Sequence, residues 1–330
     1  MALAFVFPGQ GSQAVGMGKG LAEAFAPARR VFEEVDASLG EKLSHTMWNG
    51  PAETLTLTEN AQPALMAVSL AALRALEAEA GVDLSRDAAF VAGHSLGEYS
   101  ALAAAQSLTI ADAARLLRIR GRAMQKAVPV GAGAMAALIG VELDAAKAIA
   151  AEAAAAGECA TANDNGGGQV VLSGDKAAVE RAVEIAKSHG VKRAMMLPVS
   201  APFHCALMQP AADAMAEALS QVSVRPPSVP LVANVLAEPI RDPAAIVRSL
   251  VQQVTGTVRW RESVLFMAGA GVTTFYEVGA GKVLAGLIKR IADTANVSSI
   301  GTPEDIPIAG FVSLARALAV HRGLGHDVEA

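Results

Sequence analysis

A serine flanked by two glycines is the clearest reactive group in this chain, within the sequence G-H-S-L-G at residues 93–97. The motif follows an apolar stretch at residues 88–92 and precedes a helical pattern, which predicts a tight strand-to-helix turn with Ser95 at its apex. Such a turn exposes the hydroxyl as a nucleophile, and the backbone N–H of Leu96 can then face a developing oxyanion. The alternative is a helix-capping serine in a glycine-rich turn.

A serine nucleophile needs a base, and His204 is the strongest candidate among the six histidines. It lies in the segment S-A-P-F-H-C at residues 200–205, a proline-fixed loop of the kind that carries catalytic side chains. His94 is adjacent to Ser95, so its side chain is expected to leave the turn in another direction. The other histidines lie in polar contexts or near the C-terminal end. From the residues alone, a structural role for His204 stays open.

A helical pattern at residues 110–128 places one arginine on the wrong face. At about 100° per residue, one side of this helix gathers four basic residues that are expected to be solvated: Arg115, Arg118, Arg122 and Lys126. Arg120 instead falls in the middle of the apolar side. Because an arginine is rarely buried without a partner, Arg120 is expected either to bind a substrate carboxylate or to form an internal salt bridge.

The elements that must position these residues belong to a large chain rich in aliphatic side chains. It has 330 residues, of which 52% are hydrophobic and 4% aromatic, and a net charge of −5. No apolar run reaches the roughly 18 residues of a membrane span, and the acidic balance disfavours nucleic acid as a partner. Cys159 and Cys205 provide neither a disulfide framework nor a metal site, and Cys205 is expected to be a small core residue. We therefore expect a cytoplasmic protein.

Strand and helix signals alternate along the chain, which predicts an α/β fold with a mainly parallel sheet. The first strand is expected at residues 3–7, ahead of a Pro-Gly turn. The middle of the chain shows a separate order, strand-helix-strand-strand-helix-strand, which is the βαββαβ pattern of a ferredoxin-like unit. We therefore expect residues 127–198 to be an insert, and residues 1–126 and 199–330 to form the main domain.

Four sequence segments together are typical of one enzyme family. They read F-V-F-P-G-Q-G-S-Q at residues 5–13, G-H-S-L-G-E-Y at 93–99, R-G at 120–121 and Y-E-V-G-A-G-K-V-L at 276–284. This combination, which extends over almost the whole chain, resembles the malonyl-CoA:acyl carrier protein transacylases of bacterial fatty-acid synthesis. In that family a hydrolase-like α/β domain carries a ferredoxin-like insert, so the resemblance implies the same fold here.

The resemblance assigns roles to individual residues. It implies that Ser95 is the nucleophile, His204 the base and Arg120 the residue that binds the substrate carboxylate. Gln10 would help to form the oxyanion hole, and the backbone carbonyl of Gln253 would orient the histidine. The resemblance also implies that malonyl-CoA and acyl carrier protein are the partners, and that no metal or redox cofactor is required.

The implied reaction is a ping-pong transfer through a malonyl-serine intermediate. Phe203, next to His204, is expected to crowd a branch at the malonyl α-carbon, so methylmalonyl should be the poorer substrate. Two other classes of function stay open. A serine esterase or thioesterase would discharge to water and would not need Arg120 in a pocket. A non-catalytic carrier-binding component of a polyketide assembly is disfavoured by the intact Ser95 and His204.

Overall fold

The structure, a computed structural model, describes residues 2–199 and 201–306. The strands in these ranges are β1 (Ala2–Phe7), β2 (Ala88–Gly93), β3 (Gly133–Ile139), β4 (Cys159–Asp164), β5 (Gln169–Asp175), β6 (Arg193–Met196), β7 (Leu231–Val232), β8 (Pro239–Ile240), β9 (Val272–Val278) and β10 (Asn296–Ile300). The α-helices in the same ranges are α1 (Lys19–Ala24), α2 (Ala26–Leu39), α3 (Leu43–Asn49), α4 (Ala52–Thr56), α5 (Thr58–Ala80), α6 (Leu84–Asp87), α7 (Gly97–Ala104), α8 (Ile110–Lys126), α9 (Leu143–Ala153), α10 (Lys176–Ser188), α11 (Gln209–Ser220), α12 (Pro243–Thr255), α13 (Trp260–Gly269) and α14 (Val283–Ile291).

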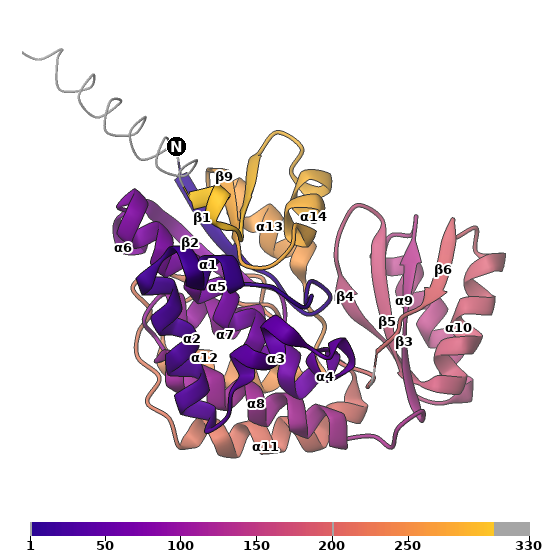
Figure 1. The fold of residues 1–330 in the computed structure, drawn as a ribbon. Helices are drawn as coiled ribbons and strands as arrows, with labels where there is room; N and C mark the ends of the chain where they lie inside the picture. Colours follow the sequence, from indigo (N-terminus) through magenta and orange to yellow (C-terminus); the bar gives the residue numbers. More distant parts are fainter. Residues whose placement is uncertain (1, 200, 307–330) are drawn as a thin grey trace, which may run out of the picture.

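The described strands form two separate sheets, the smaller of which lies on the right in Figure 1. The larger sheet has the order β10-β9-β1-β2-β7-β8, and its neighbours are parallel except for the β7–β8 pair. The smaller sheet has the order β4-β5-β3-β6, and its neighbours are all antiparallel. The predicted fold class is therefore confirmed: a mainly parallel sheet between helices, and a βαββαβ unit.

Strand β1 lies in the interior of the larger sheet and is apolar on both faces, as parallel strands between two helical layers are. Leu3, Phe5 and Phe7 pack into the core on one face, together with side chains of α2, α5 and α8. Ala4 and Val6 pack into the core on the other face, together with side chains of α13 and α14. Because successive side chains of a strand point to opposite faces, this continuous apolar stretch packs against helices on both sides of the sheet, as an interior strand must.

The smaller sheet has a covered face and a face that looks toward the main domain. Leu138 and Leu172 pack beneath α9 and α10 on the covered face. Met135 and Val171 lie on the opposite face and pack near Phe203. Because side chains alternate along a strand, the same two strands supply both layers.

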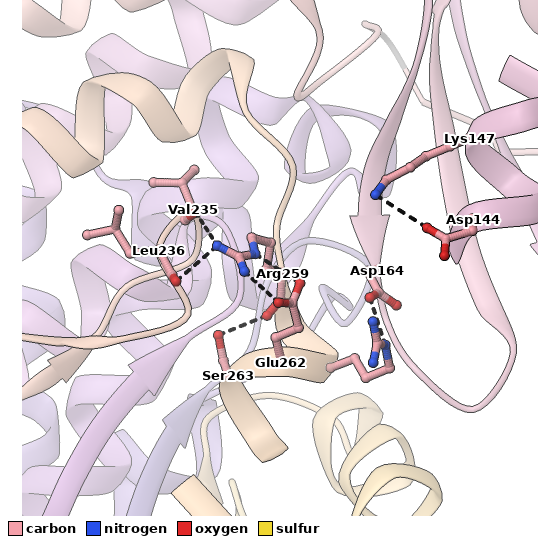
Figure 2. Close-up of polar contacts among 9 residues, drawn as sticks. Asp144, Lys147, Asp164, Val235, Leu236, Arg259, Glu262 and Ser263 are labelled. Atoms are coloured by element: carbon pink, nitrogen blue, oxygen red, sulfur yellow. Dashed lines mark hydrogen bonds and ion pairs between the residues drawn. The ribbon is translucent and has the colours of Figure 1, made fainter. Parts of the chain in front are cut away.

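The last residues of β4 tie the smaller sheet to the segment that leads into α13. The N–H of Val258 donates to the carbonyl of Ala162 at 2.8 Å, and the N–H of Asp164 donates to the carbonyl of Val258 at 2.9 Å. Nε of Arg261 also donates to the buried carboxylate of Asp164, which is labelled in Figure 2, at 2.8 Å. These bonds fix the sheet beside the main domain.

The prediction that Arg118 shares the solvated face of α8 is wrong. Arg115 and Arg122 are exposed as expected, but Arg118 is only 6% exposed. Its guanidinium pairs with Glu41, in the connection between α2 and α3, and also donates to the side chain of Asn60. The packing of these two segments over α8 covers Arg118 and supplies its acceptors.

In the described part of the chain, none of the helices combines the length and apolar character that a membrane crossing requires.

Candidate active site

Ser95 stands on a tight turn between β2 and α7. Its φ of 53° lies in the left-handed region that a side chain rarely adopts. The flanking glycines are required by the close approach of backbone. A Cβ on Gly93 would lie 1.9 Å from the carbonyl carbon of Gly97, and a Cβ on Gly97 would lie 2.2 Å from the carbonyl oxygen of Phe7. The sequence motif therefore forms a strained strand-to-helix turn that presents the serine.

The side chain of Asn234 stabilises this turn through hydrogen bonds to its backbone. This residue was not predicted from the sequence. Its Oδ1 accepts the backbone N–H of Ser95 at 2.8 Å, and its Nδ2 donates to the carbonyl of Gly93 at 2.6 Å. The side chain is fully buried. The available signal was a lone amide in the apolar run P-L-V-A-N-V-L at residues 230–236, because a buried amide must find partners.

Ser95 and His204 face each other, with Oγ of Ser95 2.8 Å from Nε2 of His204. Nδ1 of His204 lies 2.8 Å from the backbone carbonyl oxygen of Gln253. A carbonyl oxygen can only accept a hydrogen bond, so Nδ1 carries the ring proton and Nε2 accepts the serine hydroxyl. The imidazole therefore has the tautomer that a general base needs. A backbone carbonyl contacts its other nitrogen, at the position that an Asp or Glu side chain occupies in a catalytic triad.

Burial keeps the imidazole of His204 neutral. The residue is 4% exposed, and its pKa is lowered from the ordinary 6.5 to about 3. Burial is the main cause, and the positive charge of Arg120 acts in the same direction. The hydrogen bond to the carbonyl of Gln253 opposes both effects. At neutral pH the ring is thus ready to take a proton from Ser95.

We expect a pH profile that reflects this lowered pKa. The acid limb of kcat/KM for acyl loading of Ser95, which reports groups of the free enzyme, should lie below about pH 5. Loss of the positive charge in Arg120→Ala should move this limb to higher pH, because that charge lowers the pKa of His204. Quenched-flow loading by acetyl-CoA can measure both proteins. An acid limb at the ordinary histidine pKa in the unaltered chain would contradict the assignment.

Arg120 is a buried cation whose hydrogen-bond partners are all neutral. It is 1% exposed, and its Nη1 donates to Oε1 of Gln62 at 2.7 Å. Its Nη2 donates to Oε1 of Gln253 at 2.8 Å and to Oγ of Ser95 at 3.1 Å, and the guanidinium lies over the ring of Tyr99. Among the described residues, none of the ion pairs includes Arg120, and its Nε has no hydrogen-bond partner. The guanidinium is therefore free to pair with a carboxylate at the serine.

Gln10 and Leu96 lie on two neighbouring turns at the carboxyl ends of strands β1 and β2. Strands β1 and β2 are parallel neighbours with Phe7 opposite Gly93, so the turns that follow them are adjacent. Leu96 is the residue before α7, and Gln10 follows β1. The side-chain oxygen of Gln10 accepts the hydroxyl of Thr58 at 2.9 Å, which anchors that turn to α5. Backbone N–H groups at these two positions can converge on an oxyanion.

These side chains surround a cavity of about 880 Å³ between the two sheets. Phe203 contributes to its apolar wall with Met135 and Val171 of the smaller sheet. Gln253 does not line the cavity and lies fully buried behind it, in contact with His204 and Arg120. The predicted site residues that line the cavity are Gln10, Ser95, Leu96, Arg120, Phe203 and His204.

Neither His94 nor Cys205 competes for these roles. Nε2 of His94 lies 2.9 Å from Oδ1 of Asn165, and its ring packs against Trp260, so these residues rather than Ser95 or His204 hold the side chain. Cys205 is 1% exposed, and its thiol donates to the carbonyl of Pro202. In the residues that the structure describes, no group of three or more His, Cys, Asp and Glu side chains could hold a metal ion.

Comparisons with known proteins agree with this arrangement. A model of the acyl transferase domain matches residues 4–304. The malonyl CoA-acyl carrier protein transacylase of Escherichia coli (strain K12) is 48% identical over 307 residues, which cover 93% of this chain and 98% of the relative. The crystal structure of the acyl-carrier-protein-S-malonyltransferase from Bartonella henselae is 57% identical, with a TM-score of 0.93 over 94% of this chain and 99% of that one.

A further similar structure contains a relative bound to its carrier protein. It is a malonyl-transacylase in complex with its type II polyketide synthase acyl-carrier protein, and it is 41% identical to this chain. Its TM-score is 0.90, and the match covers 94% of this chain and 99% of the other. On these likenesses, over nearly all of its length, the chain belongs to the acyl transferase family and, within it, to the malonyl CoA-acyl carrier protein transacylases.

Proposed function

We propose that this chain moves the malonyl group of malonyl-CoA to the phosphopantetheine thiol of acyl carrier protein through a malonyl ester on Ser95, in support of fatty-acid biosynthesis. One observation carries the proposal for the site. Arg120 is a buried cation without a described carboxylate partner, and its Nη2 lies 3.1 Å from the nucleophilic oxygen. In a malonyl ester a single methylene group separates the carboxylate from the ester carbonyl, so the carboxylate lies within reach of that guanidinium.

Acylation begins when His204 takes the proton of Ser95 and Oγ attacks the thioester carbonyl of malonyl-CoA. The backbone N–H groups of Gln10 and Leu96 hold the oxygen of the tetrahedral intermediate. The intermediate collapses with cleavage of the C–S bond, and His204 returns its proton to the departing thiolate of coenzyme A. The product of this half-reaction is malonyl-Ser95, with its carboxylate paired to Arg120.

Deacylation repeats these steps with a new nucleophile. The thiol of the carrier's phosphopantetheine arm enters the cavity, loses its proton to His204 and attacks the ester carbonyl of malonyl-Ser95. The C–O bond to Ser95 breaks, and the serine oxygen recovers the proton from His204. Transfer from one thiol to another therefore needs only a group that accepts and returns one proton, which fits the neutral His204.

We further propose that residues 127–198 form the insert predicted from the sequence, and that Phe203 controls the size of the acyl group. Support for the first proposal comes from the smaller sheet, because all four of its strands lie within these residues. Support for the second comes from Phe203, which precedes His204 and lines the cavity. A methyl branch on the malonyl α-carbon would crowd that ring, so methylmalonyl should load more slowly than malonyl.

The proposal is tested by following where a preformed acyl-enzyme transfers its acyl group. The chain is loaded with labelled malonyl-CoA, freed of coenzyme A and mixed with the holo form of an acyl carrier protein. The label should move to the carrier on mixing, and buffer alone should release it far more slowly. Release of free malonate at the same rate with and without carrier would instead indicate a thioesterase.

We expect His204→Ala to lower malonyl transfer by roughly 10²–10⁴-fold, the usual contribution of a positioned base. The loss should appear in kcat rather than in the affinity for malonyl-CoA, since His204 contacts the reacting oxygen. Initial rates over a range of malonyl-CoA concentrations separate the two effects. His189→Ala is a suitable control, because His189 is exposed on the smaller unit. Equal activity of the His204 variant and the control would place the base elsewhere.

A further inference from the structure

Glu98 is a buried carboxylate directly beneath the nucleophile, and the mechanism above does not use it. It lies in the first turn of α7, is fully buried and does not line the cavity. Burial raises its pKa to about 7, although hydrogen bonds from Gln253 and Asn234 and the positive charge of Arg120 oppose the change. A buried carboxylate is costly unless it is well hydrogen-bonded, so its partners show what it does.

The two oxygens of Glu98 accept hydrogen bonds from two different elements. Nε2 of Gln253, on α12, donates to Oε2, and the backbone N–H of Asn234 approaches Oε1 at 3.4 Å. The same Nε2 group of Gln253 also lies 2.9 Å from the carbonyl oxygen of Ser95 and 3.3 Å from Oδ1 of Asn234. The donor end of the Gln253 amide is thus surrounded by acceptors.

This environment decides which way the amide of Gln253 points. With Nε2 toward Glu98, Oε1 faces Arg120 and accepts its Nη2 at 2.8 Å. The reverse orientation would set an NH₂ group against the guanidinium of Arg120. It would also set an amide oxygen against the carbonyl of Ser95 and Oδ1 of Asn234, neither of which can donate a hydrogen bond. Glu98 and these two acceptors therefore make the orientation that suits Arg120 the only satisfactory one.

Gln253 connects this carboxylate to both halves of the site. Its side-chain oxygen holds Nη2 of Arg120, the same nitrogen that donates to Oγ of Ser95. Its backbone oxygen accepts from Nδ1 of His204. The loop that carries Asn234 is itself fixed, because Arg259 donates to the carbonyls of Val235 and Leu236, as Figure 2 shows.

We propose that Glu98 is a positioning residue for acyl selectivity: through the amide of Gln253, it holds the guanidinium of Arg120 against Ser95, where a substrate carboxylate must bind. This inference rests on the proposed function, because it assigns a role in malonyl recognition. Glu98 does not line the cavity, so its effect should be specific to acyl groups that carry a carboxylate. A residue that merely supported the turn would affect all acyl groups alike.

The test is the ratio of kcat/KM for malonyl loading of Ser95 to that for acetyl loading. Glu98→Ala should lower this ratio by about tenfold or more, since a displaced positioning group commonly costs that much. Glu98→Gln keeps an oxygen that can accept from Gln253, so its ratio should stay within about threefold of the unaltered chain. Glu277→Gln is the matched control, a second fully buried carboxylate that caps α14, and it should leave the ratio within about twofold.

Gln253→Leu keeps the inference testable if Glu98→Ala does not fold. It removes the amide between Glu98 and Arg120 but retains the backbone carbonyl that contacts His204, so the ratio should again fall by about tenfold. An equal loss of malonyl and acetyl loading in Glu98→Ala, or an unchanged ratio in Gln253→Leu, would overturn the inference. If the unaltered chain acquires no malonyl group on Ser95, the proposed function itself fails, and the two failures are thus distinct.

Discussion

Ser95→Ala is expected to abolish the malonyl-enzyme and to lower transfer to acyl carrier protein by about 10⁴-fold or more, the scale on which loss of a serine nucleophile acts. The change removes one hydroxyl and adds no atom, so the fold should survive. His204 would then face a methyl group and have no proton to take. Initial rates of malonyl transfer to holo acyl carrier protein, together with thermal unfolding of the variant, measure the two parts of this prediction.

Ser100→Ala is the matched control for this variant. Ser100 lies on α7, only a few residues from Ser95, and is fully buried, and its hydroxyl has no hydrogen-bond partner among the described residues. Removal of that hydroxyl should therefore leave both stability and transfer nearly unchanged. Transfer at the normal rate in Ser95→Ala, with the protein folded, would be incompatible with Ser95 as nucleophile.

Arg120→Ala is expected to lower malonyl loading by at least ~10²-fold while acetyl loading is comparatively well tolerated. In the unaltered chain, acetyl leaves the buried guanidinium without a carboxylate, which costs several kcal/mol relative to malonyl. Sites that lose a buried polar partner in this way reject the smaller analogue by about 10⁴-fold. Without Arg120 that discrimination should largely disappear.

The measurement is the ratio of acetyl to malonyl loading on Ser95, which should rise in the Arg120 variant. Arg118→Ala is the control, because Arg118 is also a buried arginine of α8 but is paired with Glu41 outside the cavity. That variant is expected to lose stability and to keep the acyl preference of the unaltered chain. If the ratio does not rise in Arg120→Ala, the arginine is structural and the acyl group must be reconsidered.

Arg118 and Arg120 show where sequence reasoning works and where it stops. Helical periodicity identified Arg120 as the residue on the apolar face, because only local geometry was needed for that inference. The same periodicity placed Arg118 in solvent, and this was wrong. Its burial depends on Glu41 and Asn60, which lie far away in the sequence and pack over α8 only in the folded chain. Periodicity within one helix contains no information about such neighbours.

The buried polar residues that support the turn at Ser95 were harder to predict for a similar reason. The turn at Ser95 follows from the two glycines and the strand before them, which are local features. Asn234 and Glu98 act through hydrogen bonds to residues on other elements, as with the 2.8 Å bond from the N–H of Ser95 to Asn234. A single amide or carboxylate in an apolar stretch signals a buried polar group, but the identity of its partner depends on tertiary structure.

The most direct test of the account is the intact mass of the chain after mixing with malonyl-CoA, followed by peptide mapping. We expect one added malonyl group per chain, located on the peptide that contains Ser95 and removed when holo acyl carrier protein is added. The same treatment of Ser95→Ala should give no adduct. An adduct on another peptide, or turnover of malonyl-CoA to free malonate with no adduct that the carrier can discharge, would contradict the account.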